Sequence, residues 1–381
     1  MTSGWTKMTK MTIYNISNNK NSQKMKKKTV FAAMGAMLFT IASCDRSSLV
    51  VESPGEETAT GEILVSVTPE ENLVTKAVAA YTDSQTYESK VNTLQIFVFD
   101  SEGKINIYKS LTSKTSETVS TTQGQKTVWA VVNGSDLSDV KTVSELKAKA
   151  VDLSGNSTTE SSGFIMSGSN TCTVGTTQVS CSITVKRLAA RVALRSVKND
   201  LPASYGSLTI NRVFLDNVVG NQNIEGTASP ATWYNKEGRA DDDTRVSSHI
   251  IDGSTYKASC PSLTFKSVGQ SIDNGGSYSP STPDLFYCYA NGSTTAPDGF
   301  SETFSAQRTV LVIDATVNDK TYYYPVVLKD GTITRNTAHT VAVTITGLGS
   351  DDPNEPVDKG NIDVTITVDG WTDGAEYEET I

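Results

Sequence analysis

Apolar and polar residues alternate over many short stretches of this chain, which predicts β-strands. One helix is expected over residues 143–153, with Val143, Leu146 and Ala150 on one face. Many short strands separated by Gly, Asn, Asp and Pro favour β-sandwiches. The strands are expected at residues 62–67, 91–99, 105–111, 126–134, 178–185, 188–197, 208–219, 262–268, 285–289, 308–317, 322–328, 340–346 and 361–371.

The N-terminal region has a different pattern. Residues 25–44 begin with Met-Lys-Lys-Lys, continue with the apolar run 29–42 and end at Ser43-Cys44. A basic start, a short apolar stretch and a small-residue site are typical of a secretory signal peptide. The apolar run is too short to span a bilayer comfortably. A buried core helix is the alternative interpretation.

The end of this segment predicts a lipid anchor. Ile41-Ala42-Ser43-Cys44 matches the bacterial lipobox, in which the cysteine thiol is acylated, for example by palmitate, and the chain is cut just before it. We therefore expect residues 25–43 to be a lipoprotein signal peptide and Cys44 to be lipidated. Residues 1–24 are expected to be an upstream or disordered segment.

Composition and charge restrict the class of protein. The mature part is rich in Thr, Ser, Val and Gly, a β-rich composition, and it is long enough for two domains with a boundary near Lys186-Arg187. The formal net charge of −9 argues against nucleic acid as a partner.

Candidate catalytic groups are few. The two histidines, His249 and His339, are far apart in the sequence, and His339 is expected at the start of a strand. Two isolated histidines argue against a zinc site or a Ser-His pair, and no catalytic or phosphate-binding motif occurs. We expect a protein that is not an enzyme and that needs neither a metal nor another cofactor.

Two cysteines lie close together in the sequence. Cys172 and Cys181 flank residues 173–178, which read as the tip of a hairpin. A cross-strand disulfide and a pair of free, half-buried thiols are both compatible with this spacing.

Two predicted strands are separated from the neighbouring domain by a break or a linker, so each could leave that domain. The strand 62–67 is followed by a break at Pro69 and by a loop that contains Lys76. The strand 361–371 follows the charged, Pro-containing linker 351–356.

The C-terminal strand has an apolar face. Burying its four apolar side chains contributes about 6–12 kcal/mol gross, while ordering the backbone costs about 1–2 kcal/mol per residue. Docking therefore needs a full ladder of main-chain hydrogen bonds, as in donor-strand complementation. Trp371 either anchors the strand in a pocket or caps the last core. The four apolar residues of this face are Ile362, Val364, Ile366 and Val368.

These features together resemble the fimbrillin family of Bacteroidales, the major (FimA-type) subunits of type V pili. The resemblance covers residues from about 25 to the C-terminus. Besides the lipobox, it rests on Thr75-Lys76-Ala77 and on residues 90–100, 186–194 and 364–371.

The resemblance implies an all-β fold and a processing mechanism. It implies a propeptide (44–76), two transthyretin-like or Greek-key β-sandwich domains (77–187 and 188–350), and a linker with a donor strand (351–381). A trypsin-like protease would remove the propeptide with its strand. The C-terminal strand of another copy would then fill the open groove.

The expected cleavage site lies between Lys76 and Ala77. Lys76 is the only basic residue between Arg46 and Lys90, although a solvated loop lysine is the alternative interpretation. Family members are typically cut after arginine. This chain has no arginine between Arg46 and Arg187, so an Arg-only protease could not process it here.

The expected function is that of a fimbrial stalk subunit in adhesion and biofilm formation. Its partners would be other copies of itself, accessory fimbrial subunits, the protease, the outer membrane before cleavage, and host or bacterial surface receptors. A glycan-binding surface lipoprotein of a nutrient-uptake system is the alternative, and it would present exposed tryptophans. The run Tyr322-Tyr323-Tyr324 is interpreted as a cross-strand ladder beside Pro325 rather than as a binding patch.

Overall fold

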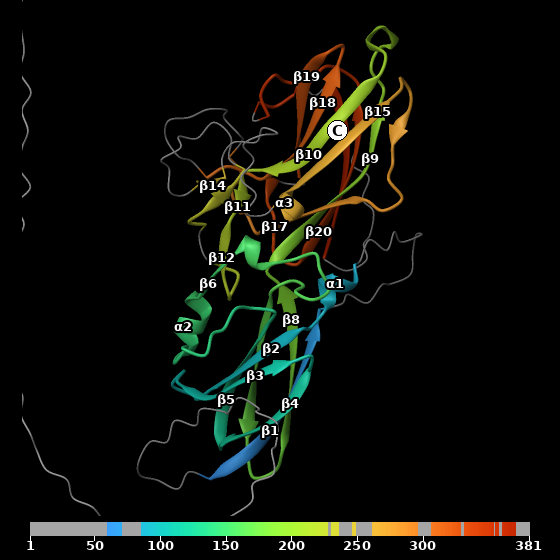
Figure 1. Cartoon of the computed structure of the whole chain (residues 1–381). Coiled ribbons are helices and arrows are strands. Elements are labelled where there is room, and N and C mark those ends of the chain that lie inside the picture. Colours follow the sequence, from blue (N-terminus) through green and yellow to red (C-terminus); the bar gives the residue numbers. More distant parts are fainter. Residues whose placement is uncertain are drawn as a thin grey trace, which may run out of the picture. The chain divides into compact units, whose positions relative to one another are not determined.

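The alternating stretches form strands in the computed structural model of the chain (Figure 1). All described residues belong to one compact unit, Arg46–Ile381. None of the helices in this described part is long and apolar enough to cross a membrane. The structure describes residues 59–70, 85–227, 230–235, 246–248, 261–295, 306–328, 331–353, 355–357 and 360–370.

The fold is all-β, as predicted, and its helices are short. The helices are α1 (Thr86–Ser89), α2 (Val143–Ala148) and α3 (Pro261–Thr264). The strands are β1 (Thr60–Pro69), β2 (Thr93–Phe99), β3 (Ile105–Thr112), β4 (Ser116–Thr122), β5 (Gly124–Val132), β6 (Ala150–Asp152), β7 (Met166–Val174), β8 (Val179–Arg187), β9 (Ala189–Asn199), β10 (Leu208–Asp216), β11 (Val218–Val219), β12 (Asn221–Asn223), β13 (Trp233–Tyr234), β14 (Val246–Ser248), β15 (Phe265–Ile272), β16 (Ser277–Tyr278), β17 (Asp284–Tyr289), β18 (Val310–Val317), β19 (Lys320–Val327), β20 (Thr337–Ile345) and β21 (Ile362–Gly370).

The first seven long strands form one sheet that closes around a core of its own. Its order is β3-β2-β5-β7-β8-β1-β4. Inward side chains of all seven strands belong to one apolar cluster, so the part β4-β1-β8 packs against the part β3-β2-β5-β7. The two parts are joined where β7 pairs with β8. This arrangement is a β-sandwich whose two layers share one apolar core.

Two further sheets face a second, larger core. One sheet has the order β15-β10-β18-β19, and the other has the order β16-β9-β20-β21, with β17 also paired to β9. Strand β20 runs parallel to β9 and antiparallel to β21. A short pairing of β6 with β12 connects the segment after α2 to this second group of strands.

Most of the expected strands are present. The predicted and observed bounds agree best where apolar and polar residues alternate most clearly. The hairpin around residues 318–320 is confirmed, with Asn318 and Asp319 in the left-handed conformation that its tight turn needs. The expected strand 208–219 is divided at Asn217, which has a φ of 53°. Pro325 lies on β19, an edge strand, as expected for a proline in a sheet.

The helix prediction was too long. Helix α2 ends at Ala148 because the backbone of Lys149 leaves the helical region, and the next residues pair with β12 instead. Ala150 is therefore an exposed strand residue rather than part of the helix face, while Leu146 is buried as expected. Tertiary pairing has overridden local helix propensity here.

Candidate functional site

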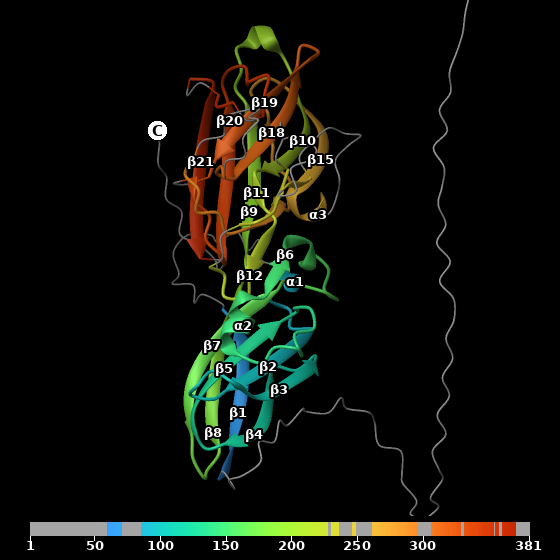
Figure 2. The ribbon, with the colours of Figure 1, turned by 90° about the vertical axis from the view of Figure 1, so that its left-hand side faces the viewer.

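Strand β1 is the middle strand of a three-stranded face and has a different partner on each side (Figure 2). It is antiparallel to β4 and parallel to β8. Val65, for example, lies opposite Glu117 of β4 and opposite Cys181 of β8. If β1 leaves, the walls β4 and β8 are left with a row of unpaired backbone groups on both sides of a groove.

One face of β1 fills the smaller core. Ile63 and Val65 are fully buried, and the side chain of Val67 is 3% exposed. Leu64 and Ser66, which alternate with them, are only partly buried. Burying three apolar side chains of this size contributes roughly 5–9 kcal/mol gross. The empty groove would therefore expose a large apolar surface.

Gly61 marks the place where β1 passes directly against the hairpin between β7 and β8. A Cβ atom at this position would lie 2.1 Å from the carbonyl oxygen of Gly175 and 2.6 Å from Cγ1 of Val174. Both distances are far shorter than a carbon atom tolerates, and the first involves a backbone atom that cannot rotate away. This position therefore accepts only glycine.

Glu70 anchors the chain at the end of β1. Its backbone N–H donates to the carbonyl oxygen of Val185 at 2.8 Å. Its carboxylate accepts a hydrogen bond from Nδ2 of Asn336 at 2.5 Å and lies 3.1 Å from Nζ of Lys186. The end of β1 is thus tied to β8 and to the residue that precedes β20.

A second anchor follows in helix α1. The carboxylate of Glu88 is buried, forms an ion pair with Arg191 at 2.9 Å and accepts a hydrogen bond from the hydroxyl of Tyr287 at 2.7 Å. Burial, reinforced by the charge of Glu88, raises the pKa of Tyr287 well above its usual value, so the phenol keeps its proton and donates. Nε of Arg187 donates to the backbone carbonyl of Glu88 at 2.6 Å. The chain before β2 is therefore fixed to β8, β9 and β17.

The predicted cleavage residues lie between these two anchors in the sequence. Lys76 and Ala77 lie outside the described residues, as does Cys44. The cleavage and lipidation sites stay predictions. The structure does describe both flanks, Glu70 and Gln85, and each lies next to a fixed contact.

Strand β21 differs from β1 in its position, because it lies at the edge of its sheet and, among the described strands, pairs only with β20 (Figure 2). Ile362, Val364 and Ile366 are partly buried against the larger core. Asp363 and Thr365 alternate with them and are exposed. The predicted donor strand thus exists as a strand with one apolar face.

The other two predicted donor residues are less fully described. The backbone of Val368 lies opposite His339 of β20. Trp371 lies outside the described residues, so its role as an anchor or a cap stays a prediction.

Cys172 and Cys181 are free thiols in this structure, and their side chains are within hydrogen-bonding reach of each other. Burial raises the pKa of Cys181 to about 12 and also raises that of Cys172. The disulfide between them stays a prediction. Cys288 is a third free thiol, completely buried in β17.

Among the residues that the structure describes, the other candidate groups do not form a chemical site. His339 lies near the start of β20, as expected, and burial lowers its pKa to about 4. His249 lies outside the described residues. Trp129 and Trp233 are buried, so neither offers an indole for sugar stacking. Within the described ranges, no group of His, Cys, Asp and Glu is arranged to hold a metal ion.

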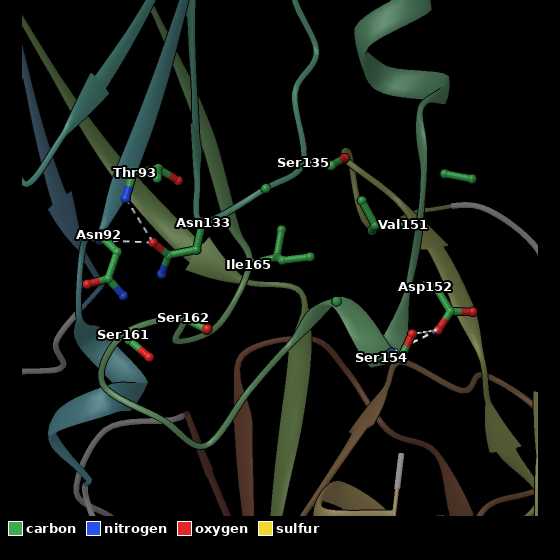
Figure 3. Close-up of a pocket in the computed structure, with 13 residues that line it drawn as sticks. Asn92, Thr93, Asn133, Ser135, Val151, Asp152, Ser154, Ser161, Ser162 and Ile165 are labelled. Atoms are coloured by element: carbon green, nitrogen blue, oxygen red, sulfur yellow. Dashed lines mark hydrogen bonds between the residues drawn. The ribbon is translucent and has the colours of Figure 1, made fainter. Parts of the chain in front are cut away.

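A hollow of about 540 Å³ lies beside the ends of β2 and β5 (Figure 3). The side chains of Asn133 and Asp152 are already engaged within the protein. Oδ1 of Asn133 accepts from the backbone N–H groups of Asn92 and Thr93. Asp152, the one ionisable residue in the lining, accepts from the N–H and hydroxyl of Ser154. The hollow therefore offers no arrangement for acid, base or nucleophilic catalysis.

Sequence reasoning missed three features of the groove. It missed Gly61, for which the only signal is a glycine directly before an alternating stretch. It missed Glu88, which looks like an ordinary loop carboxylate in the sequence. It also missed the wall strand β4, whose one buried apolar side chain is Val119.

Comparisons with solved structures agree on the fold. A candidate cell adhesion protein from Bacteroides eggerthii is 21% identical with a TM-score of 0.59, and the match covers 83% of this chain and 98% of that one. A fimbrilin from Porphyromonas gingivalis is 14% identical with a TM-score of 0.54, and the match covers 84% and 98%. A search of curated proteins gave no match.

The fold is that of a β-sandwich protein, and it is similar to the fold of a solved fimbrilin. Residues 62–185 match the family model of the major fimbrial subunit protein (FimA). The predicted resemblance to the fimbrillin family is therefore confirmed over this region. The matched family is one of structural subunits rather than enzymes, and the match supports a role as a fimbrial subunit.

Proposed function

We propose that this chain is a fimbrial stalk subunit that polymerises by protease-triggered donor-strand exchange. Its precursor is a lipoprotein, held in the outer membrane through Cys44. Cleavage after Lys76 releases the lipid together with β1, and β21 of another copy occupies the groove. The observation that carries this proposal is the position of β1 between β4 and β8, where its departure opens a groove through the sheet.

The exchange is favourable because β21 would form more main-chain hydrogen bonds and bury more apolar surface in the groove than at the edge of its own sheet. At the sheet edge, β21 forms a ladder with β20 along one side, and its apolar face is only partly buried. In the groove, a strand pairs on both sides, and residues such as Ile63 and Val65 are fully buried. Moving β21 from the edge to the groove therefore adds main-chain hydrogen bonds and buries more apolar surface.

The anchors at Glu70 and Glu88 support cleavage between them. After a cut at Lys76, β1 keeps its position only through non-covalent contacts. The chain that begins at Ala77 stays attached, because Glu88 remains paired with Arg191 and Tyr287. The same arrangement suits repetition, since each copy has one groove and one donor strand, and a head-to-tail contact that does not close gives a filament.

The partners that follow are further copies of this chain, accessory subunits at the ends of the fibre, a trypsin-like protease, and surface receptors of a host or of other bacteria. The net charge of −9 argues against nucleic acid.

The decisive experiment is the mass and N-terminal sequence of the protein sheared from cells. A start at Ala77 in multimers that resist SDS supports the proposal. A start at acylated Cys44 in a monomer contradicts it. The variant Lys76→Gln should keep the longer form and block assembly, whereas Lys114→Gln, which changes an exposed lysine elsewhere, should be processed normally.

A further inference from the structure

Strands β1 and β21 share more than an alternation of apolar residues. Strand β1 contains Gly61-Glu-Ile-Leu-Val-Ser-Val, and the C-terminal region contains Gly360-Asn-Ile-Asp-Val-Thr-Ile. Aligning the two glycines places every inward apolar residue of β1 beside an apolar residue of β21. The aligned pairs are Ile63 with Ile362, Val65 with Val364, and Val67 with Ile366.

The glycine has a clear physical reason in β1. Any side chain at position 61 would collide with the carbonyl oxygen of Gly175, 2.1 Å from where its Cβ would lie. An incoming strand that takes the path of β1 must meet the same requirement, because Gly175 belongs to the hairpin between β7 and β8 rather than to β1.

The glycine at position 360 has no such reason in the resting structure. A Cβ atom there would have no heavy atom within 4 Å, and the backbone is not in the left-handed region. The residue is also exposed. Neither the fold nor the local conformation of this copy therefore requires glycine at position 360.

We propose that β21 enters the groove of another copy in the direction of β1, parallel to β8 and antiparallel to β4, with Gly360 in the place of Gly61. This inference rests on the donor-strand function proposed above and adds the direction and register of the strand. Ile362, Val364 and Ile366 then occupy the core sites of β1.

The same register also fits the outward face and the end of the groove. Thr365 takes the place of Ser66, whose hydroxyl lies 3.1 Å from that of Ser182, so a hydroxyl is kept at this contact. Asp369 takes the place of Glu70, which contacts Lys186 and Asn336, so an acidic residue is kept at this end of the strand.

The opposite direction fits less well. A reversed strand that keeps the three apolar residues in the three core sites puts Ile366 at the site of Ile63. It then brings Val368 to the site of Gly61, where a branched side chain meets the backbone of Gly175. Apolar alternation alone does not distinguish the two directions, but the glycine does.

The first test replaces the glycine. In the full-length chain, Gly360→Ala should reduce SDS-resistant multimers at least tenfold while the melting temperature of the monomer stays unchanged. The matched control is Gly292→Ala, because Gly292 is also exposed with nothing within 4 Å of a Cβ position. Normal assembly of Gly360→Ala overturns the proposed register.

A truncation separates this inference from the function on which it rests. Removing residues 360–381 should abolish assembly. If the truncated chain is inactive while Gly360→Ala assembles normally, the register is wrong and donor-strand exchange stands. If the truncated chain still assembles, donor-strand exchange fails and the register fails with it.

The second test measures direction by cross-linking between copies. Neighbouring strands lie about 4.8 Å apart, within the range that a disulfide can bridge. The pair Thr365→Cys and Ser182→Cys should give an oxidised ladder of multimers on a non-reducing gel. The pair Asp363→Cys and Ser182→Cys should give little, because Asp363 takes the place of Leu64, which lies opposite Ser180.

The reversed strand predicts the opposite result, since it exchanges the places of residues 363 and 365. A ladder from Asp363→Cys and none from Thr365→Cys therefore overturns the inference. Each single-cysteine variant serves as the control for reactions of the native thiols, including Cys172 and Cys181.

Discussion

Glu88 and Arg191 form a buried ion pair, with 2.9 Å between Oε2 of the carboxylate and Nη1 of the guanidinium. The two side chains are 1% and 7% exposed. The pair joins helix α1 to strand β9, so it links the chain just before β2 to the sheet that also holds β21. Its hydrogen bond from Tyr287 extends the link to β17.

Breaking this pair on one side should be strongly destabilising. Glu88→Ala leaves the guanidinium of Arg191 buried without its carboxylate, which costs about 3–5 kcal/mol of unfolding free energy. Chemical denaturation measures this loss. Glu102→Ala, which removes an exposed partner of Lys104, should change stability little. A double variant with Arg191→Met should lose less than the sum of the two single changes, and simple additivity would argue against direct coupling.

Shortening the apolar face of β1 should weaken the hold of the groove on its own strand. Ile63→Ala removes a fully buried side chain and should cost about 2–5 kcal/mol of unfolding free energy in the uncleaved protein. Because β1 must leave before a donor strand can enter, the same variant should polymerise faster after cleavage. Ser66→Ala is the control on the outer face. An unchanged or slower rate of assembly for Ile63→Ala would show that release of β1 is not limiting.

Stability should fall in mild acid because of His339. Burial lowers its folded pKa to about 4, below the usual value of 6.5, so the unfolded chain binds a proton first. The contribution of neutral His339 to the free energy of unfolding is fully present above about pH 6.5 and is lost as the pH falls toward 4. At about 1.4 kcal/mol per pH unit, the total loss is roughly 3 kcal/mol.

The difference between the wild type and His339→Gln isolates this effect from the carboxylates. Unfolding measured from pH 7 to pH 4 should show a shallower decline for the variant. Equal pH profiles would mean that the pKa of His339 is the same in the folded and unfolded states.

The paired thiols should be oxidisable without unfolding. An oxidant of the disulfide class, such as oxidised glutathione, should join Cys172 and Cys181 slowly, because burial raises both thiol pKa values and so disfavours the reactive thiolate. Alkylation after unfolding, followed by peptide mass, should show that Cys172 and Cys181 no longer react. Cys288 should react only after unfolding, since it is fully buried. Alkylation of both Cys172 and Cys181 after oxidation would exclude the bond.

The sequence predicts strands where side-chain alternation is backed by turn chemistry. The hairpin of β18 and β19 is the clearest case, because Asn318 and Asp319 favour the left-handed conformation that the turn adopts. Strand β21 is equally readable from its alternating Ile, Val and Thr. In both cases local preference and tertiary pairing favour the same structure.

Strand β4 shows why other parts could not be predicted. Its sequence, Ser-Glu-Thr-Val-Ser-Thr-Thr, has one apolar side chain, and nothing in it indicates a wall of the groove. It is a strand because β1 pairs with it, a relationship between residues far apart in the chain. Helix α2 was overextended for the same reason, since the pairing of β6 with β12 begins where local propensity would continue the helix.

The candidate site was predictable in its parts but not in its connections. The sequence alone indicates a strand at residues 62–67 and an apolar strand near the C-terminus. It does not indicate that Glu70 contacts Asn336, 266 positions later, or that Glu88 is buried against Arg191. Such contacts depend on which strands become neighbours, which no local pattern specifies.

The contact between Gly61 and the carbonyl of Gly175 has a consequence for the fibre as a whole. A strand with alternating apolar residues can slip by two positions and still present an apolar face. A slip in one direction would bring Ile362 to the site of Gly61, and a slip in the other would bring Asp358, and both carry side chains. The carbonyl oxygen of Gly175 thus fixes the position of the donor strand along the groove. Every subunit in the filament would therefore have the same spacing from the next.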